Sequence, residues 1–531
     1  MRHTDDDVTG GGYSFWVGVC FTLNYIIGRY AMKCSSNCCN VSPADLQYFM
    51  SHSGSGFLTL PWAFHQTGPI LGCIVLAVFA WFSIVAVVFI LEANDRANTI
   101  RDAGRDSELP TVYNELHAPN TGYRTIKDKD SAFEVPDSNQ MDAASHLHSI
   151  VVVRSGQSCR VEMTELCRLF LGERAKQAFA CVISVYMYGT LWAYVTVFAK
   201  AFAIVFNFST YSYELYLVLF AFIVVPLSLM ELSEQVYIQV TLAVFRVVMV
   251  AVMISTTSIA YLTRTPAFGE LSNMGFGGSS SSTGLQDGPP SELLNFNASK
   301  LYQLLPLAAY AYIFHHSVTA LSEPIADRRD LTKMFAISLL AAFIGYTLLA
   351  IALASYFGPN VLSSSNLNWI YYVGSKKGID DPTPYYAQVI ALFVILFPAL
   401  DVASAYPLNA FTLGNNLMSS YFGDEIQAHE KSRLQLSGFR LLASLPPFVG
   451  AFFVSDLGHI TSFTGLTGFV IAFIVPPLLA YYSDARMKQL ELSTATVHSS
   501  AWASTGWQYA VCSAGVMLTI GVAISCVLAT D

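Results

Sequence analysis

The sequence predicts an all-α polytopic membrane protein, and three observations lead to this class. The 531 residues are 53% hydrophobic and only 12% charged, whereas a soluble globular domain carries about a quarter charged residues. Apolar runs of about 20 residues, the length that crosses a bilayer as a helix, recur along the chain. Lys and Arg are divided unequally between alternate loops, as expected for a chain that crosses a membrane repeatedly.

Hydropathy predicts eleven spanning helices, the first of them in two pieces, 13–28 and 55–66. Several spans contain Pro or Gly, which membrane helices tolerate when neighbouring helices satisfy the released backbone groups. A polar tail, 1–12, precedes one transmembrane domain, 13–531. The remaining spans are predicted at 70–92, 177–206, 213–231, 236–263, 302–322, 334–358, 385–408, 435–455, 460–482 and 507–529.

A polar insert, 29–54, interrupts the first span with residues that include Arg29, Lys33 and Asp45. Each charged side chain in hydrocarbon costs about 2 to 3 kcal/mol. Either the insert is expelled to one face of the membrane, or it is a retained intron or gene-model error, since its deletion restores helix length. Sequencing the mature transcript distinguishes the two.

The segment 93–175 is predicted to be a largely disordered cytosolic loop, because it is charged and shows little periodicity. Its last part differs. Apolar residues at Val161, Leu166, Leu169 and Phe170 indicate an interfacial helix that leads into the third span.

The loop charges predict that the N-terminus is cytosolic and the C-terminus lies on the other side of the membrane. In this orientation the short cytosolic loops hold seven basic residues, and the opposite face holds four. The seven are Arg328, Arg329, Lys333, Lys431, Arg433, Arg486 and Lys488, and the four are Arg264, Lys300, Lys376 and Lys377.

Small residues at the join of the first span form one candidate site. Without the insert, Gly28, Ser55 and Gly56 become neighbours in mid-helix. Such residues permit unwinding, which exposes backbone N–H groups to a substrate carboxylate. Close packing of small residues against another helix explains them equally well.

Polar residues inside the sixth span form a second candidate site, because ionisable groups at bilayer depth mark a pathway or a partner. His315, His316 and Ser317 are adjacent. The two His residues relay protons or bind substrate, or they are interior residues bonded to a neighbouring helix. In the third span, Tyr188 is a candidate for lining the pocket, with core packing as the alternative.

Charged residues in two other spans form a candidate coupling site. Asp401, followed by Ser404, has the carboxylate and hydroxyl that a Na⁺ or proton site needs. Arg246 either takes the place of a bound cation or pairs with Asp401. Neutralisation of two opposite charges in hydrocarbon motivates the second interpretation.

Five stretches together resemble the amino acid/auxin permease family. Within that family the transmembrane protein 104 branch is the most similar, with related residues after span 6 and around span 8. The stretches are "SGFLTLPWAF" with the preceding "NYIIG", "VYMYG", "FHHSVTALSEPI", "FPALDVASAYPLNAFTLGNN" and "TGLTGFVIAFIVPPLLAYY".

The resemblance implies the leucine-transporter fold, with two inverted repeats of five helices, spans 1 and 6 broken at the substrate site, and an eleventh span. It implies that Gly28, Ser55 and Gly56 lie in the unwound part of span 1 and His315 to Ser317 in that of span 6. Asp401 departs from the branch, where a hydroxyl residue is usual, and this favours H⁺ over Na⁺ as the coupling ion.

The function expected from the resemblance is secondary active transport of a small neutral amino acid, coupled to H⁺ or Na⁺. The alternative is a membrane sensor that binds an amino acid with little flux. Plasma and endolysosomal membranes are both candidate locations. Because no phosphate-binding loop, HExxH motif or nucleophile elbow is present, we expect no enzyme activity, cofactor, metal site or nucleic-acid partner.

Overall fold

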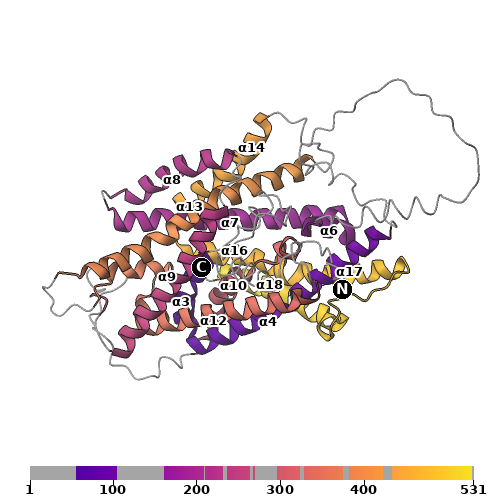
Figure 1. Cartoon of the computed structure of the whole chain (residues 1–531), viewed down its shortest axis with the longest axis horizontal. Helices are drawn as coiled ribbons and strands as arrows, with labels where there is room; N and C mark the ends of the chain where they lie inside the picture. Colours follow the sequence, from indigo (N-terminus) through magenta and orange to yellow (C-terminus); the bar gives the residue numbers. More distant parts are fainter. Residues whose placement is uncertain are drawn as a thin grey trace, which may run out of the picture.

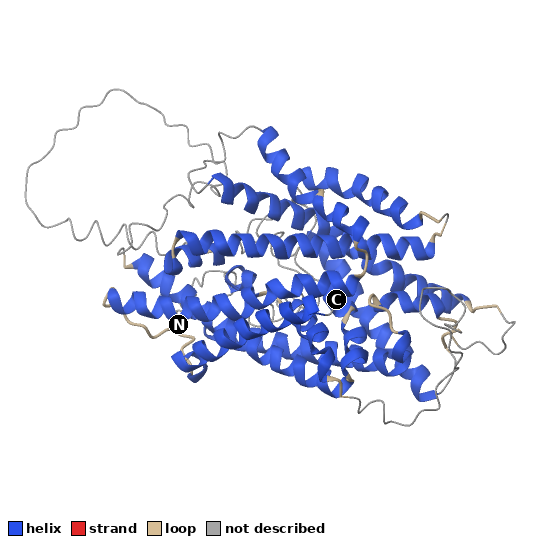
Figure 2. Cartoon of the chain, turned by 180° about the vertical axis from the view of Figure 1, so that it is seen from behind, coloured by secondary structure: helices blue, strands red, loops and turns tan. Residues whose placement is uncertain are grey.

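The computed structural model describes residues 55–103, 161–207, 210–230, 236–263, 267–269, 296–322, 328–374, 382–422 and 433–528. These residues are largely helical, and among them the only β pairing is an isolated bridge between Phe268 and Tyr372 (Figure 2). Ten of the described helical segments are long and apolar enough to cross a membrane. The tail 1–12, the first half of span 1 with Gly28, and the insert 29–54 lie outside the described residues.

Span 1 is represented by its second half, the turn η2 (Ser55–Leu58) and α3 (Leu60–Thr67). Spans 2 to 5 follow as α4 (Pro69–Asp102), α7 (Glu173–Val205), α8 (Ser212–Leu229) and α9 (Val236–Thr263). Span 6 consists of α10 (Leu301–Tyr312), η7 (His315–Ser317) and α11 (Val318–Ser322), and spans 7 and 8 are α12 (Leu331–Phe357) and α13 (Tyr385–Phe422). Span 9 consists of α14 (Arg433–Ser444) and α15 (Pro446–Phe453). Span 10 consists of α16 (Leu457–Phe469), the π-helical turn η11 (Val470–Ile474) and α17 (Val475–Gln489), and span 11 is α18 (Thr505–Leu528).

The helix contacts repeat when each span is exchanged for the one five places later. Span 3 packs on span 8 (α7 on α13), span 2 on span 7 (α4 on α12) and span 1 on span 6 (α3 on α10). The contact of α9 with α12 is matched by that of α17 with α4, and the contact of α7 with α8 by that of α13 with α14. Figure 1 shows α7, α8 and α13 on one side and α4 and α12 on the other. Five crossings reverse the direction of the chain, so the two repeats are inverted, as the leucine-transporter fold requires.

Span 6 is broken where the resemblance predicts it. The helix α10 ends at Tyr312, and Ile313 is extended, with φ −75° and ψ 114°. Phe314 follows with φ −149° and ψ 2° before the turn η7 and the short helix α11. The break contains β-branched, aromatic and His residues, which have low helix propensity. The prediction of a broken sixth span is therefore confirmed.

Two glycines allow close contact at the centre of the bundle. A Cβ at Gly465 of α16 would overlap the backbone carbonyl of Pro306 in α10, and a Cβ at Gly189 of α7 would overlap the side chain of Thr464. Only glycine permits these distances. Helices α7, α10 and α16 therefore form a tightly packed inner layer.

Two helices run at least ten residues further than hydropathy predicts. Span 2 was expected to end at residue 92 and span 8 at 408, but α4 continues to Asp102 and α13 to Phe422. In α4 the extension is possible because Glu92 and Arg96, both buried, lie within 3.4 Å of each other.

A short helix, α6 (Met163–Leu171), precedes α7, as its apolar pattern predicts. Leu166 and Phe170 are buried, and the helix packs against α4, α7 and α17. It therefore ties span 2 to spans 3 and 10 at the end of the bundle where α7 begins. The section 104–160 of the predicted disordered loop lies outside the described residues.

Candidate substrate and coupling sites

The break in span 6 places three polar residues in the interior. His315, His316 and Ser317 have exposed fractions of 0%, 7% and 3%. The Nε2 atom of His315 lies 3.4 Å from the carbonyl oxygen of Ser83 in α4, and the backbone N–H of Ser317 donates to Phe314 over 2.9 Å. The turn η7 is therefore anchored to span 2 through His315.

Gly56 brings the second half of span 1 beside this break. A Cβ at Gly56 would lie 2.6 Å from the Tyr310 ring, in the last turn of α10. The hydroxyl of Thr59 donates to the carbonyl of Gly56 over 2.8 Å and closes the turn η2. Close packing and a local break in the regular helix thus coexist at Gly56.

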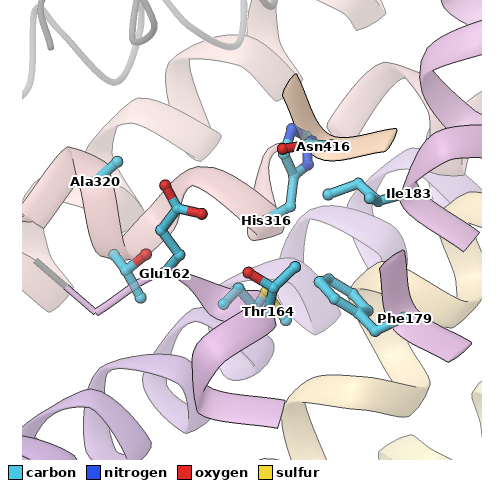
Figure 3. A pocket seen from close by; sticks show the side chains of 9 residues that line it. Glu162, Thr164, Phe179, Ile183, His316, Ala320 and Asn416 are labelled. Carbon is cyan, nitrogen blue, oxygen red and sulfur yellow. The ribbon is translucent and has the colours of Figure 1, made fainter. Parts of the chain in front are cut away.

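A cavity lies beneath His316, between α6, α7, α11 and α13 (Figure 3). His316 and Asn416 both line it, and Phe179 and Ile183 of α7 line it as well (Figure 3). Glu162 and Thr164, at the start of α6, complete the polar part of the lining. The cavity therefore combines an apolar wall with His, amide, hydroxyl and carboxylate groups, in a volume of about 20 Å³.

Tyr186 contacts the sixth span, whereas Tyr188 does not reach His316. The ring centroid of Tyr186 lies 5.6 Å from that of His316 and 6.2 Å from that of Tyr310. Tyr188, two positions on, donates its hydroxyl to the carbonyl of Leu442 in α14 over 2.8 Å. Residues two apart on a helix point in nearly opposite directions, so only one of these tyrosines faces η7.

Arg246 of α9 and Asp401 of α13 form a buried ion pair. Their exposed fractions are 3% and 8%. The Nε atom of Arg246 donates to Oδ2 of Asp401 over 3.1 Å, and Nη2 contacts both carboxylate oxygens. Of the two interpretations for Arg246, the structure shows the pairing with Asp401. The Ser404 hydroxyl donates to the backbone carbonyl of Asp401 over 2.9 Å rather than to the carboxylate.

Tyr346 of α12 connects the ion pair with the broken helix. Arg246 interacts electrostatically with Tyr346. The hydroxyl of Tyr346 donates to the carbonyl of Ala311, in the last turn of α10, over 3.4 Å. Its ring also lies 5.7 Å from that of Tyr312. Tyr346 therefore contacts the last turn of α10 and lies within electrostatic range of Arg246.

Several residues of this region were not among the sequence candidates. Tyr310, Tyr346, Asn416 and Glu162 come from four different elements. No spacing rule relates them, because they meet only when the spans pack. For Glu162 the signal was present: a carboxylate directly before an amphipathic helix. Among the described residues, no group of three His, Cys, Asp or Glu is placed to hold a metal ion.

The inverted repeats, the broken sixth span and the cavity beside it define a polytopic membrane protein of the transporter class. Comparison with known families agrees with this class. The model for "Transmembrane amino acid transporter protein" matches residues 146–522. The chain belongs to this family.

Curated relatives carry one name. A transmembrane protein 104 homolog of Dictyostelium discoideum is 25% identical over 454 residues, covering 81% of this chain and 86% of the relative. A Drosophila melanogaster homolog is 24% identical and covers 86% and 90%. Human transmembrane protein 104 is 22% identical and covers 94% and 93%. The resemblance inferred from the sequence is thus confirmed.

Solved structures give weaker matches. A manganese transporter of Eremococcus coleocola aligns at 11% identity with a TM-score of 0.47, covering 97% of this chain and 88% of that one. A Na⁺-coupled sialic acid symporter gives 11% identity and a TM-score of 0.38, covering 96% of each chain. Because both scores lie below 0.5, the fold assignment rests on the helix contacts and the family.

Proposed function

We propose that this protein is a secondary active transporter that moves a small neutral amino acid by alternating access around the break in span 6. The observation that carries the proposal is this break with its adjoining cavity. Backbone carbonyls at the end of α10 are suited to a substrate amino group, and His316 with Asn416 supplies polar contacts. Gly28 and Ser55 remain predicted carboxylate-binding positions, beside Gly56.

We propose H⁺ as the coupling ion, because the Arg246 guanidinium occupies the place at Asp401 where a metal cation would bind. Protonation of Asp401 removes the charge that holds Arg246. Arg246 then interacts differently with Tyr346, whose hydroxyl contacts the end of α10. In this way a proton at span 8 alters the substrate site in span 6.

The test is uptake of radiolabelled neutral amino acids by proteoliposomes with an imposed pH or Na⁺ gradient. We expect saturable uptake driven by the pH gradient. Saturable binding without uptake would instead indicate an amino acid sensor, and uptake driven by Na⁺ alone would overturn the choice of ion.

Variants at Asp401 test the coupling step. We expect Asp401→Asn to abolish the dependence of uptake on the pH gradient while exchange of substrate across the membrane persists. Glu173→Gln, which removes an exposed carboxylate at the start of α7, is the matched control. Unchanged coupling in Asp401→Asn would remove Asp401 from the mechanism.

A further inference from the structure

The segment that joins α17 to α18 returns along the bundle instead of extending away from it. We name residues 490–504 the strap. Three contacts fix it: the carbonyl of Thr494 accepts hydrogen bonds from Arg96, the His498 side chain is 1% exposed beside Asp95, and the Trp502 ring lies 5.5 Å from that of Trp81. All three partners belong to α4.

Arg96 joins the strap to two spans. Its Nε and Nη2 atoms each donate to Thr494 over 3.3 Å, and Nη1 donates to Ala480 and Ser483 of α17 over 3.0 and 2.9 Å. Asp484 of α17 lies 3.8 Å from Nη2. This one side chain therefore connects α4, α17 and the strap.

His498 joins the strap to a third span. Its Nδ1 atom lies 3.2 Å from the hydroxyl of Thr332, at the start of α12, and its Nε2 atom lies 3.7 Å from Asp95. Arg328, in the turn η8 (Arg328–Asp330) before α12, contacts the same carboxylate over 3.4 Å. The imidazole is thus inserted between α4 and α12.

The surroundings of His498 determine how it responds to pH. Burial lowers the pKa of His498 below its ordinary value; Asp95 opposes this effect, and Arg328 adds to it. The other charged groups on the strap and the adjoining elements are Glu92, Arg96, Arg101 and Asp102 of α4, Arg329 and Asp330 of η8, Lys333 of α12, Asp484, Arg486 and Lys488 of α17, and Glu491 of the strap. Burial also raises the pKa of the neighbouring Asp95 carboxyl above its ordinary value near 4, so His498 and Asp95 both take up protons as the pH falls, and a neutral substitute for His498 separates the two.

The direction of the pH dependence follows from the linkage between proton binding to His498 and attachment of the strap. A His whose pKa is lowered in the attached state binds fewer protons there than when it is hydrated. Attachment is therefore favoured above the ordinary value of about 6.5 and weakens as the pH falls through it.

We propose that the strap is a proton-operated lock: with His498 neutral it holds α4, α12 and α17 together, and protonation of His498 releases it. Release detaches the strap from α4 and α12, so that α17 is held to α4 only by their direct packing and by the hydrogen bonds of Arg96. Because α17 also packs on α6, whose N-terminal residues line the cavity beneath His316, the lock controls access to the cavity from this end of the bundle. This consequence for transport rests on the proposed function, whereas the lock itself does not.

Hydrogen exchange of the full-length protein in lipid nanodiscs, measured by mass spectrometry at pH 7.5 and 5.5, tests the lock without any substrate. After correction for the intrinsic rates, we expect backbone amides of 490–504 to exchange several-fold faster at pH 5.5. In His498→Gln, which is neutral at both pH values, the two rates should be equal. His459→Gln, which alters a His 82% exposed on α16, should behave as the unmodified chain does.

Equal rates at both pH values in the unmodified chain would overturn the proposal, as would a pH response that survives in His498→Gln. If His498→Gln does not fold, Asp95→Asn replaces it. That variant removes the carboxylate that stabilises the charged imidazole in the attached strap, so attachment should weaken more on acidification and the midpoint of release should move to higher pH. An unmoved midpoint would also contradict the lock.

Discussion

Two buried arginines in this molecule use their guanidinium groups in opposite ways. Arg246 directs its donors to one carboxylate, that of Asp401, inside the bundle. Arg96, 5% exposed, distributes its donors over a strap carbonyl, a carbonyl and a hydroxyl of α17, and nearby carboxylates. A pair that depends on one carboxyl changes state when a single proton binds. Hydrogen bonds from one guanidinium to several partners persist when one partner is lost, so they suit a lasting connection between helices.

The largest expected effect on stability comes from removing one member of the Arg246–Asp401 pair. Asp401→Leu leaves Arg246 buried beside an apolar side chain, and we expect the free energy of unfolding to fall by about 3 to 5 kcal/mol. Adding Arg246→Met should restore most of it, since no unpaired charge then remains. Denaturant titration of the purified variants in mixed micelles measures both. A double variant as unstable as the single one would contradict this account.

Arg96→Met should cost less, about 1.5 to 3 kcal/mol, because it removes charge-assisted hydrogen bonds to groups that water can partly reach. The Asp484 side chain, for example, is 27% exposed. Arg96→Lys is the matched variant, which keeps the charge but loses the planar set of donors. The same titration compares them, and hydrogen exchange should show faster exchange of residues 490–504 in Arg96→Met. If the strap is unaffected, Arg96 does not hold it.

A third charged group, at the opposite end of the bundle, extends the comparison to a half-exposed site. Asp456 begins α16 and accepts from the backbone N–H of His459 over 3.0 Å and from Ser363 over 2.7 Å. Asp456→Ala should cost about 1 kcal/mol as a lost N-cap, whereas Asp456→Asn should cost little, because Asn is an equally good cap. Thermal unfolding of the two variants decides this.

The pH dependence at Asp456 has the same sign as that at His498 but falls in a lower pH range. Burial raises the pKa of Asp456. Hydrogen bonds from Ser363 and His459 and the charge of Lys200 lower this pKa by more than burial raises it, so it lies below its ordinary value. Its stabilising effect is therefore present above that ordinary value, near 4, and is lost as the pH falls through the lowered value. A difference between Asp456→Ala and the unmodified chain that grows on acidification would contradict this sign.

The smallest expected effect on stability is that of Tyr346→Phe, about 0.5 kcal/mol, because its hydrogen bond to Ala311 is long, at 3.4 Å. Under the proposed coupling, however, the same change should reduce the dependence of uptake on the pH gradient. Tyr356→Phe, on the same helix near Phe268, is the control. Normal coupling in Tyr346→Phe would show that the ion pair does not act on span 6 through Tyr346.

Hydropathy was sufficient to predict the spans among the described residues, because apolar runs long enough to cross a bilayer have few other stable forms. The same reasoning gave the Arg246–Asp401 pair as one of two alternatives, since opposite charges in hydrocarbon need each other. Where charged residues satisfy one another inside the protein, as Glu92 and Arg96 do, hydropathy ends the helix too early.

Apart from the Arg246–Asp401 pair, contacts between distant spans were beyond sequence reasoning. Tyr346 is one of many aromatic residues in apolar runs, and only packing places its hydroxyl at Ala311. His498 lies in a polar segment that hydropathy assigns to water, yet its side chain is buried because it meets Asp95 and Thr332 from two other spans. Such residues can be identified only from a three-dimensional structure.

The contact of Gly465 with Pro306 also constrains how the bundle deforms. Because α16 and α10 touch backbone to backbone, no layer of side chains lets one slide over the other, and they move as a rigid block. The π-helical turn η11 joins α16 to α17, and Pro476 and Pro477 follow in the first turn of α17, where they lack backbone N–H donors, so regular helical hydrogen bonding is interrupted here. Span 10 thus consists of two parts that meet at this interruption: α16 packs on the broken helix, and α17 packs on α4.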